Sequence, residues 1–182
     1  MRIVLHIGTH KTGTSSIQAV CDTSRAALLQ QGILYPVVDS YNRHSILATP
    51  FMPKVPREFA PRFGTDHTEA SAYAMQLWRR VRHQVIAQPN VSTLVLSSEH
   101  FANVPDAAAL IAAVQSLAPG AEIEILCYLR RPDDRYLSGT QQVLKASHKL
   151  HWPSQSNLLP NLDKWQGLGR LTLREFDRKT LV

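Results

Sequence analysis

The stretch His6-Ile7-Gly8-Thr9-His10-Lys11-Thr12-Gly13-Thr14-Ser15-Ser16 decides what kind of fold this chain can adopt. An apolar run over residues 3–7 leads into it, as expected of a buried strand. Apolar residues at helical spacing lead out of it from Thr14 to Leu28, and Gly32 follows where a helix commonly ends. The glycines let the backbone turn tightly and approach a ligand closely. The sequence therefore predicts a strand–loop–helix unit whose loop offers N–H groups, a lysine and hydroxyl groups to an anion.

The alternation of strand and helix continues along the chain. Apolar or β-branched runs predict further strands at residues 33–35, 93–97, 123–129 and 171–176. Helical spacing or helix-start residues predict helices at 70–85, 106–118 and 132–147. Because most of these strands are apolar on both faces, they favour a parallel sheet that is covered on both sides. We expect one domain over residues 1–182, a three-layer α/β/α fold with a central, mostly parallel sheet, like that of P-loop NTPases.

Residues 36–67 interrupt this alternation. They contain five prolines and few periodic apolar positions, which predicts an irregular, Pro-containing excursion. The sequence leaves open whether this excursion is a functional loop or a mobile surface insertion. We expect His44, which lies in it, to be a solvated loop histidine, with contact to an acceptor substrate as the alternative. The chain ends soon after its last predicted strand, so we expect the C-terminal part of the domain to be missing.

The composition restricts the classes of protein to consider. The chain carries a formal net charge of +6 and has a pI near 9.6, which favours anionic partners without singling one out. Arg79, Arg80, Arg82 and His83 interleave with apolar residues like the solvated face of a helix, so no nucleic-acid partner is predicted. No apolar stretch approaches the roughly 20 residues of a membrane span, and no signal peptide is recognisable. We expect a soluble, cytoplasmic protein.

Metal binding is not predicted. Cys21 and Cys127 lie inside apolar periodic segments and are expected to be buried thiols in a reducing compartment. There is no C-x-x-C pair and no His/Cys cluster at zinc spacing. The acidic pair Asp133-Asp134 suits the start of a helix better than magnesium binding. His6 alternates with core residues on the first predicted strand, so we expect it to be structural.

The loop differs from the Walker A pattern G-x-x-x-x-G-K-[ST] at an important position. Gly8 and Gly13 have the required separation, but residue 14 is Thr where that pattern has Lys. The lysine, Lys11, lies two residues before the second glycine instead. The lysine of a kinase or ATPase must reach the β- and γ-phosphates beside a metal ion. The displaced lysine therefore argues against a P-loop nucleoside or small-molecule kinase, which stays as an alternative.

A second motif follows the predicted strand at residues 123–129. It reads Arg130-Arg131-Pro132-Asp133-Asp134-Arg135-Tyr136-Leu137-Ser138. Proline suits a first helical turn, and the two aspartates suit the helix dipole there. Ligands of open α/β sheets bind at the carboxyl ends of the strands, so both motifs are predicted to open on the same side of the sheet. An arginine in that place can bind a phosphate through its planar fork of donors.

Together the two motifs resemble those of sulfotransferases that use 3′-phosphoadenosine 5′-phosphosulfate (PAPS), and heparan-type N- and O-sulfotransferase domains resemble them best. That family has K-T-G-T-[ST] after its first strand and R-x-P-x-x-R-x-x-S after a later one, and both patterns are complete here. The resemblance implies that Lys11 contacts the bridging oxygen between phosphate and sulfate. It implies as ligands Thr12, Gly13, Thr14 and Ser15 for the 5′-phosphate, and Arg130 and Ser138 for the 3′-phosphate. The basic segment that closes over the nucleotide in the family has no clear counterpart here.

Transfer to an acceptor also needs a base, and Glu99 and His100 follow the predicted strand at residues 93–97. The resemblance allows either residue type, and we favour Glu99 because a carboxylate here is similar to the N-sulfotransferase arrangement. A carboxylate needs burial to bring its pKa near working pH, whereas an imidazole titrates there intrinsically. Both residues could instead only cap the next segment. The acceptor, whether carbohydrate, lipid or small molecule, is not predicted, and a non-catalytic anion-binding module is a further alternative.

Overall fold

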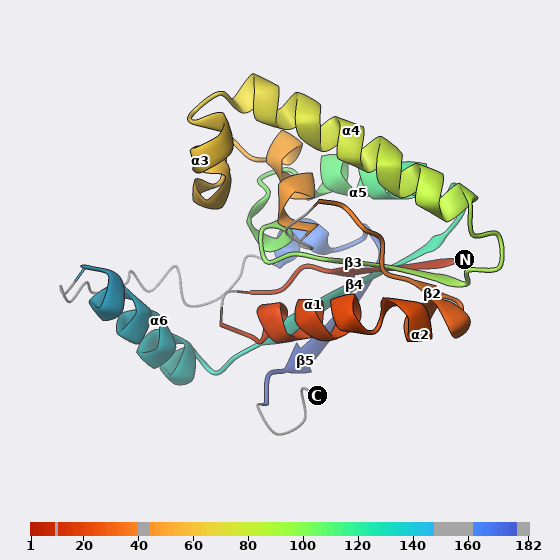
Figure 1. Ribbon diagram of the computed structural model, residues 1–182. Coiled ribbons are helices and arrows are strands. Elements are labelled where there is room, and N and C mark those ends of the chain that lie inside the picture. Colours follow the sequence, from red (N-terminus) through yellow and green to blue (C-terminus); the bar gives the residue numbers. More distant parts are fainter. Residues whose placement is uncertain (10, 40–43, 148–161, 178–182) are drawn as a thin grey trace.

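The computed structural model describes residues 1–9, 11–39, 44–147 and 162–177. Its centre is a five-stranded sheet in which all neighbouring strands are parallel, in the order β2-β3-β1-β4-β5 (Figure 1). The strands are β1 (Arg2–His6), β2 (Ile33–Leu34), β3 (Thr93–Ser97), β4 (Glu122–Leu129) and β5 (Arg170–Glu175). The longer α-helices are α1 (Thr14–Thr23), α2 (Arg25–Gln30), α4 (His67–Ile86), α5 (Ala107–Leu117) and α6 (Pro132–Ser147).

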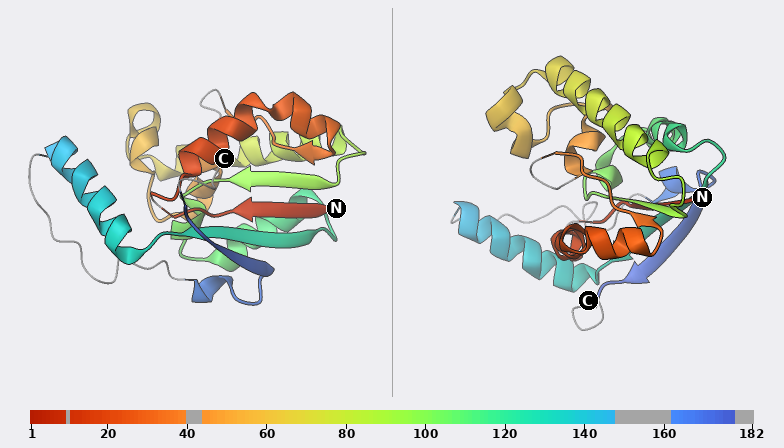
Figure 2. Two further views of the ribbon diagram at one scale, coloured as in Figure 1. Left: turned by 90° about the horizontal axis from the view of Figure 1, so that it is seen from below. Right: turned by 45° about the vertical axis from the view of Figure 1, so that its right-hand side comes forward.

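Helices cover the sheet on both faces. Helices α1 and α2 lie on one face and α4 and α5 on the other, which gives the three predicted layers (Figures 1 and 2). A short 3-10 helix, η5 (Asp163–Trp165), packs beside α5, where Lys164 Nζ donates hydrogen bonds to the carbonyls of Ala102 and Val104 at 2.8 and 2.6 Å. Helix α6 extends beyond the carboxyl ends of the strands (Figure 2). The predicted α/β class with a parallel, P-loop-like sheet is confirmed.

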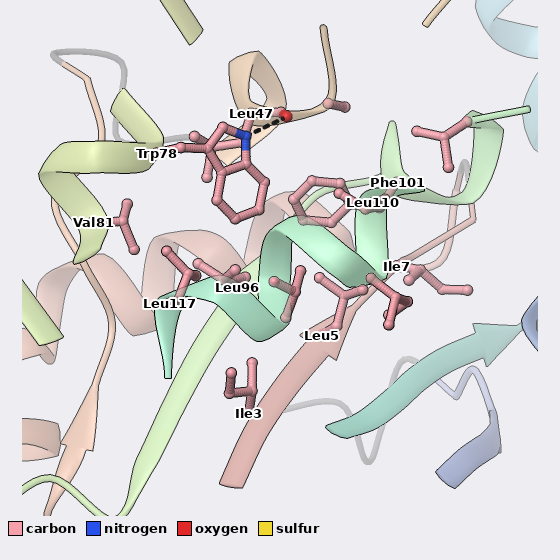
Figure 3. Packing of buried hydrophobic residues seen from close by; sticks show 14 of the residues in the cluster. Ile3, Leu5, Ile7, Leu47, Trp78, Val81, Leu96, Phe101, Leu110 and Leu117 are labelled. Carbon is pink, nitrogen blue, oxygen red and sulfur yellow. Dashed lines mark hydrogen bonds between the residues drawn. The ribbon is translucent and has the colours of Figure 1, made fainter. Parts of the chain in front are cut away.

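The main core lies between the sheet and the layer of α4 and α5. Alternate residues of β1 and of the position that follows the strand point into this core and are fully buried. These are Ile3, Leu5 and Ile7 (Figure 3). They meet apolar side chains of β3, α4 and α5, including Leu96, Val81, Leu110 and Leu117 (Figure 3). Burial of this apolar area is the main favourable term in folding and fixes which face of β1 turns toward α5.

The helix that follows the first loop is shorter than predicted. Instead of running from Thr14 to Leu28 without interruption, it breaks at Ser24 into α1 and α2. The Thr23 hydroxyl donates to the carbonyl of Ala19 at 3.0 Å. Such a bond from a Thr side chain to the preceding turn competes with the backbone ladder and often bends a helix.

The excursion over residues 36–67 contains helical turns where the structure describes it. These are η1 (His44–Phe51), η2 (Arg57–Phe59) and α3 (Ala60–Phe63). Residues 44–49 are buried, and Trp78 of α4 donates a hydrogen bond to the Leu47 carbonyl at 3.0 Å (Figure 3). Because the buried apolar residues form a short cluster without a helical or strand period, the sequence gives no sign of this packing.

His44 anchors the excursion to the sheet. The expectation of a solvated loop histidine is wrong, because the side chain is fully buried. Its Nδ1 accepts a hydrogen bond from the Ser97 backbone N–H at 3.0 Å. Its Nε2 therefore carries the proton and donates to the Pro36 carbonyl at 3.1 Å. With both ring nitrogens used in this way, His44 has a structural role.

A second buried histidine, His6, lies at the end of β1. Its Nδ1 is 2.7 Å from the Ser97 hydroxyl oxygen, and Gln18 of α1 donates to the Ser97 carbonyl at 2.9 Å. These bonds join two strands and a helix below the first loop. His6 is thus buried inside the fold, as expected for a structural residue.

The two cysteines are free thiols. Cys127 is buried as predicted, and burial raises the pKa of its thiol to about 11, whereas Cys21 is only half-buried. In the part of the chain that the structure describes, no helix has both the length and the apolar character needed to cross a membrane. Within the same residues, no three His, Cys, Asp or Glu side chains gather as metal ligands.

We predict that the fold loses stability between pH 7 and pH 5 because of the two buried histidines, His6 and His44. Burial lowers the pKa of both His6 and His44 from 6.5 to about 4. Between these values the unfolded chain binds more protons than the folded one, so stability is present above pH 6.5 and falls as the pH decreases. The loss is about 2 kcal/mol for each histidine by pH 5. Thermal unfolding across this pH range measures it.

A pair of variants separates this effect from general titration. His44→Gln should lose less stability than the wild type between pH 7 and pH 5, measured relative to its own value at pH 7. His83→Gln removes a histidine that is exposed on α4 and should follow the wild-type curve. An identical pH dependence for all three proteins would contradict the assignment.

Candidate functional site at the carboxyl edge of the sheet

The two sequence motifs meet at one edge of the sheet. Strands β1 and β4 are parallel neighbours, so the loop after β1 and the segment after β4 leave side by side. The guanidinium of Arg130 donates through Nη1 to the Lys11 carbonyl at 3.2 Å. The Thr9 hydroxyl donates to the Tyr128 carbonyl at 3.1 Å. Segments 119 residues apart in sequence are therefore hydrogen-bonded to each other, on the same side of the sheet as predicted.

The first loop has an unusual backbone. Gly8 and Gly13 have positive φ angles of 46° and 75°, which glycine adopts without steric cost. A Cβ atom on Gly8 would lie 2.6 Å from the Thr14 hydroxyl oxygen, so a side chain there does not fit. Lys11 has a φ of 70° and, within the described residues, is alone among non-glycine residues in having a positive φ. A strained position of this kind is often found at functional sites.

The hydroxyl groups of the loop divide into two roles. Thr12 is fully buried, and its hydroxyl donates to the Thr9 carbonyl at 2.6 Å and accepts from the Thr9 N–H at 3.3 Å, so it shapes the loop. The Thr14 hydroxyl is buried and has no hydrogen-bond partner. Ser15 is exposed in the first turn of α1, and no side chain caps that turn at Gly13. The loop therefore leaves a hydroxyl and helix N–H groups without internal partners, which fits an anion.

Two positively charged residues, Lys11 and Arg130, lie at this loop. Neither Lys11 nor Arg130 forms a salt bridge with any carboxylate among the described residues. The Nε of Arg130 is buried without a hydrogen-bond partner, and its guanidinium lies 5.4 Å from the ring centre of Phe176. The next residue, Arg131, is exposed and pairs with Asp133 at 2.9 Å. Cations without a counter-charge at the edge of a sheet favour an anionic ligand.

Ser138, the other residue implied for the 3′-phosphate, lies on α6. That helix starts directly after the Arg130 segment and extends outward from the carboxyl edge (Figure 2). Ser138 is half-buried, in the second turn of the helix. Its contact with a nucleotide stays a prediction.

The two candidate bases follow β3, and the backbone of one of them contacts the same loop. The Ser98 N–H donates to the His6 carbonyl at 3.0 Å, which joins this turn to the end of β1. The Cα of Glu99 would be 3.4 Å from a Cβ on Gly8, so the backbone of Glu99 contacts the first loop. Both candidates are thus at the edge that carries Lys11 and Arg130.

His100 has a partner that the sequence did not indicate. Its Nε2 lies 3.0 Å from a carboxylate oxygen of Glu58 in η2. Burial alone would raise the pKa of Glu58, but hydrogen bonds from His100 and Ser45 and the charge of His100 outweigh it and lower that pKa. No sequence motif could have identified Glu58, because it lies in the proline-rich segment and 42 residues before His100.

No family model matches the sequence, and no curated protein matches it either. Among solved structures, a candidate kinase from Chloroflexus aurantiacus is similar, with a TM-score of 0.51, 12% identity, and coverage of 100% of this chain and 88% of that chain. A structure from the PezAT toxin–antitoxin system of Streptococcus pneumoniae has a TM-score of 0.48 and 15% identity, and the match covers 97% of this chain and 69% of that chain. A sulfotransferase from Alicyclobacillus acidocaldarius has a TM-score of 0.48 and 16% identity, and the match covers 97% of this chain and 73% of that chain. The first likeness shows a P-loop-like fold and nothing finer.

We predict that the backbone strain at Lys11 serves binding at the cost of stability. Lys11→Gly should raise the free energy of unfolding by about 1 kcal/mol, because glycine adopts a positive φ without the penalty of an L side chain. Lys11→Ala keeps a Cβ and should leave stability within about 0.5 kcal/mol of the wild type. Chemical denaturation of the three proteins measures this. Equal stability of the Gly and Ala variants would mean that the loop is unstrained.

Proposed function

We propose that this chain is a sulfotransferase that moves a sulfuryl group from PAPS to a hydroxyl or amine of an acceptor. The observation that carries the proposal is the hydrogen bond of Arg130 with the Lys11 carbonyl, since it brings two phosphate-type motifs to one edge of the sheet. The acceptor belongs to the carbohydrates, lipids or other small molecules.

The donor nucleotide would lie across the carboxyl ends of β1 and β4. In this proposal the first turn of α1, with Gly13, Thr14 and Ser15, holds the 5′-phosphate. The unpartnered Thr14 hydroxyl and the uncapped helix supply donors for it. Thr12 contributes mainly by holding the loop in shape, because its hydroxyl is already bonded to Thr9. Arg130 and Ser138 hold the 3′-phosphate.

Lys11 would act on the bond that breaks. The acceptor oxygen or nitrogen forms a bond to sulfur while the bond from sulfur to the bridging oxygen breaks. The electron pair of that bond stays on the 5′-phosphate, and the acceptor proton passes to a base. Lys11 has no counter-charge among the described residues and can stabilise the negative charge that develops on the bridging oxygen. Glu99 and His100 are the candidate bases.

The position of the lysine favours this reaction over phosphoryl transfer from ATP. Residue 14, where a P-loop kinase has its lysine, is Thr, and its hydroxyl is buried next to Gly8. Lys11 precedes the second glycine by two residues, as in the loop of sulfotransferases. A P-loop kinase and a non-catalytic anion-binding module are outcomes of the experiments that follow.

We predict that the two phosphate sites can be separated by comparing two nucleotides. The wild type should bind adenosine 3′,5′-bisphosphate more tightly than adenosine 5′-monophosphate in calorimetry. Arg130→Ala should weaken binding of the bisphosphate by about 10- to 100-fold, the effect of losing a charge-assisted hydrogen bond, and hardly change binding of the monophosphate. Lys11→Ala should weaken both.

The matched control is Arg131→Ala, which removes the same charge from the adjacent exposed position and should change neither affinity. Equal weakening of both nucleotides by Arg130→Ala would place that arginine on the 5′-phosphate. Tighter binding of ATP with magnesium than of the bisphosphate would support a kinase. Binding of sulfated polymers with no affinity for either adenosine nucleotide would support an anion-binding module.

We also predict the effect of Lys11 on the reaction itself. In a transfer assay with PAPS and a panel of acceptors, Lys11→Ala should lower kcat by about 100- to 1000-fold, as expected when a donor to a developing oxyanion is removed. Its thermal stability should stay close to that of the wild type. An unchanged kcat would exclude the role of Lys11 in departure of the 5′-phosphate.

A further inference from the structure

We propose that Glu58 is a positioning residue for His100 and that Nδ1 of His100 takes up the proton that the acceptor hydroxyl or amine loses. The inference rests on the proposed sulfotransferase function and chooses between its two candidate bases. It also gives the proline-rich segment a place in the active site.

His100 lies at the same edge of the sheet as the loop that carries Lys11. It follows β3, whose last residue, Ser97, is paired with His6 at the end of β1. The preceding residue, Glu99, contacts Gly8 of the loop through its backbone. The side chain of His100 is only 14% exposed, so little water competes for its hydrogen bonds.

Glu58 determines which nitrogen of His100 is free. A carboxylate only accepts hydrogen bonds, so the contact of 3.0 Å requires a proton on Nε2. In the neutral imidazole the lone pair is then on Nδ1, and no hydrogen bond among the described residues uses that nitrogen. When Nδ1 takes a proton, the ring becomes positive and the Glu58 carboxylate stabilises it. A histidine oriented by a carboxylate is a common arrangement for a general base.

The segment that supplies Glu58 is attached to the strand that precedes His100. Ser45, which is buried, contributes to the lowered pKa of Glu58. The neighbour of Ser45 is His44, which accepts the backbone N–H of Ser97, the last residue of β3. The excursion that carries Glu58 is therefore hydrogen-bonded to β3 three residues before His100.

A second carboxylate, that of Glu99, affects Glu58, because its negative charge tends to raise the pKa of Glu58. The hydrogen bond and charge of His100 act in the opposite direction, and the pKa of Glu58 is lowered overall, so its carboxylate is charged and accepts from Nε2 of His100. In this proposal His100 takes the proton.

The test is a double-mutant cycle in the transfer assay. Glu58→Ala should lower kcat by about 10- to 100-fold and leave the affinity for adenosine 3′,5′-bisphosphate unchanged. His100→Ala should lower kcat at least as much. The double variant should be no slower than His100→Ala alone, because Glu58 acts only through that histidine. Additive losses would overturn the proposal.

Two controls accompany the cycle. Glu69→Ala removes an exposed carboxylate from α4 and should leave kcat unchanged. Glu58→Gln keeps an oxygen that can accept the Nε2 proton but lacks the charge, so its kcat should lie between those of the wild type and Glu58→Ala. A Glu58→Gln variant as slow as Glu58→Ala would mean that orientation contributes nothing.

A measurement without turnover separates this inference from the proposed function. Nitrogen NMR of the His100 ring should show the proton on Nε2 in the wild type at a pH where the ring is neutral, and a mixture of tautomers in Glu58→Ala. If the wild type neither binds the bisphosphate nor transfers sulfate, the proposed function fails and His100 is no base. The orienting role of Glu58 is then decided by the tautomer, and an unchanged tautomer in Glu58→Ala would overturn it.

Discussion

The parallel pairing of β1 with β3 on one side and β4 on the other is the constraint on which the candidate site depends. The register pairs His6 with Ser97, so β1 and β3 end at the same level, whereas β4 continues three residues beyond Leu126, the other partner of His6, to Leu129. The segments that follow β1 and β4 are nevertheless joined, because Arg130 donates to the Lys11 carbonyl. The apolar core beneath β1 holds the pairing, because a shift of one residue would turn Ile3 and Leu5 out of it.

The loop after β1 shows how the neighbouring strand maintains an unfavourable backbone. A left-handed conformation at Lys11 costs about 1–2 kcal/mol. Among the hydrogen bonds that hold the loop are three with distances of 3.2 Å or less, from Thr9 to Tyr128, from Arg130 to Lys11 and from Thr12 to Thr9. At about 0.5–1.5 kcal/mol each, they are sufficient to offset the strain. Two of the three come from the contact with β4, so the shape of the loop depends on the sheet and not on the loop alone.

The excursion after β2 has a comparable dependence on β3. Buried residues of η1 pack against α4, and His44 fixes the segment to the backbone of Ser97. As a result, Glu58 reaches His100 from a part of the chain that carries no catalytic motif. The carboxyl edge thus carries Lys11 and Arg130 near one end and the Glu58–His100 pair near the other, and we propose that the first binds phosphate and the second takes up a proton.

The sequence by itself determined the local units. Glycine positions, the change from strand to helix period and the proline at the start of α6 are properties of neighbouring residues, so the loop with Lys11 and the segment with Arg130 could be located without a structure. The proposal that both segments bind phosphate rests on the same local chemistry. The break in the first helix at Ser24 is also a local effect, but its cause is a side-chain bond that the apolar period does not reveal.

Only the tertiary structure decided the strand order β2-β3-β1-β4-β5, the burial of His44 and the pairing of Glu58 with His100. The strand order depends on which arrangement of the whole chain packs the apolar faces of strands and helices best, and the pattern of neighbouring residues does not contain that information. His44 and Glu58 lie in a segment without a period, where the sequence pattern cannot distinguish a buried residue from a solvated one. Their contacts exist because η1 and η2 pack onto β3 and α4, and contacts between distant segments are set by that packing.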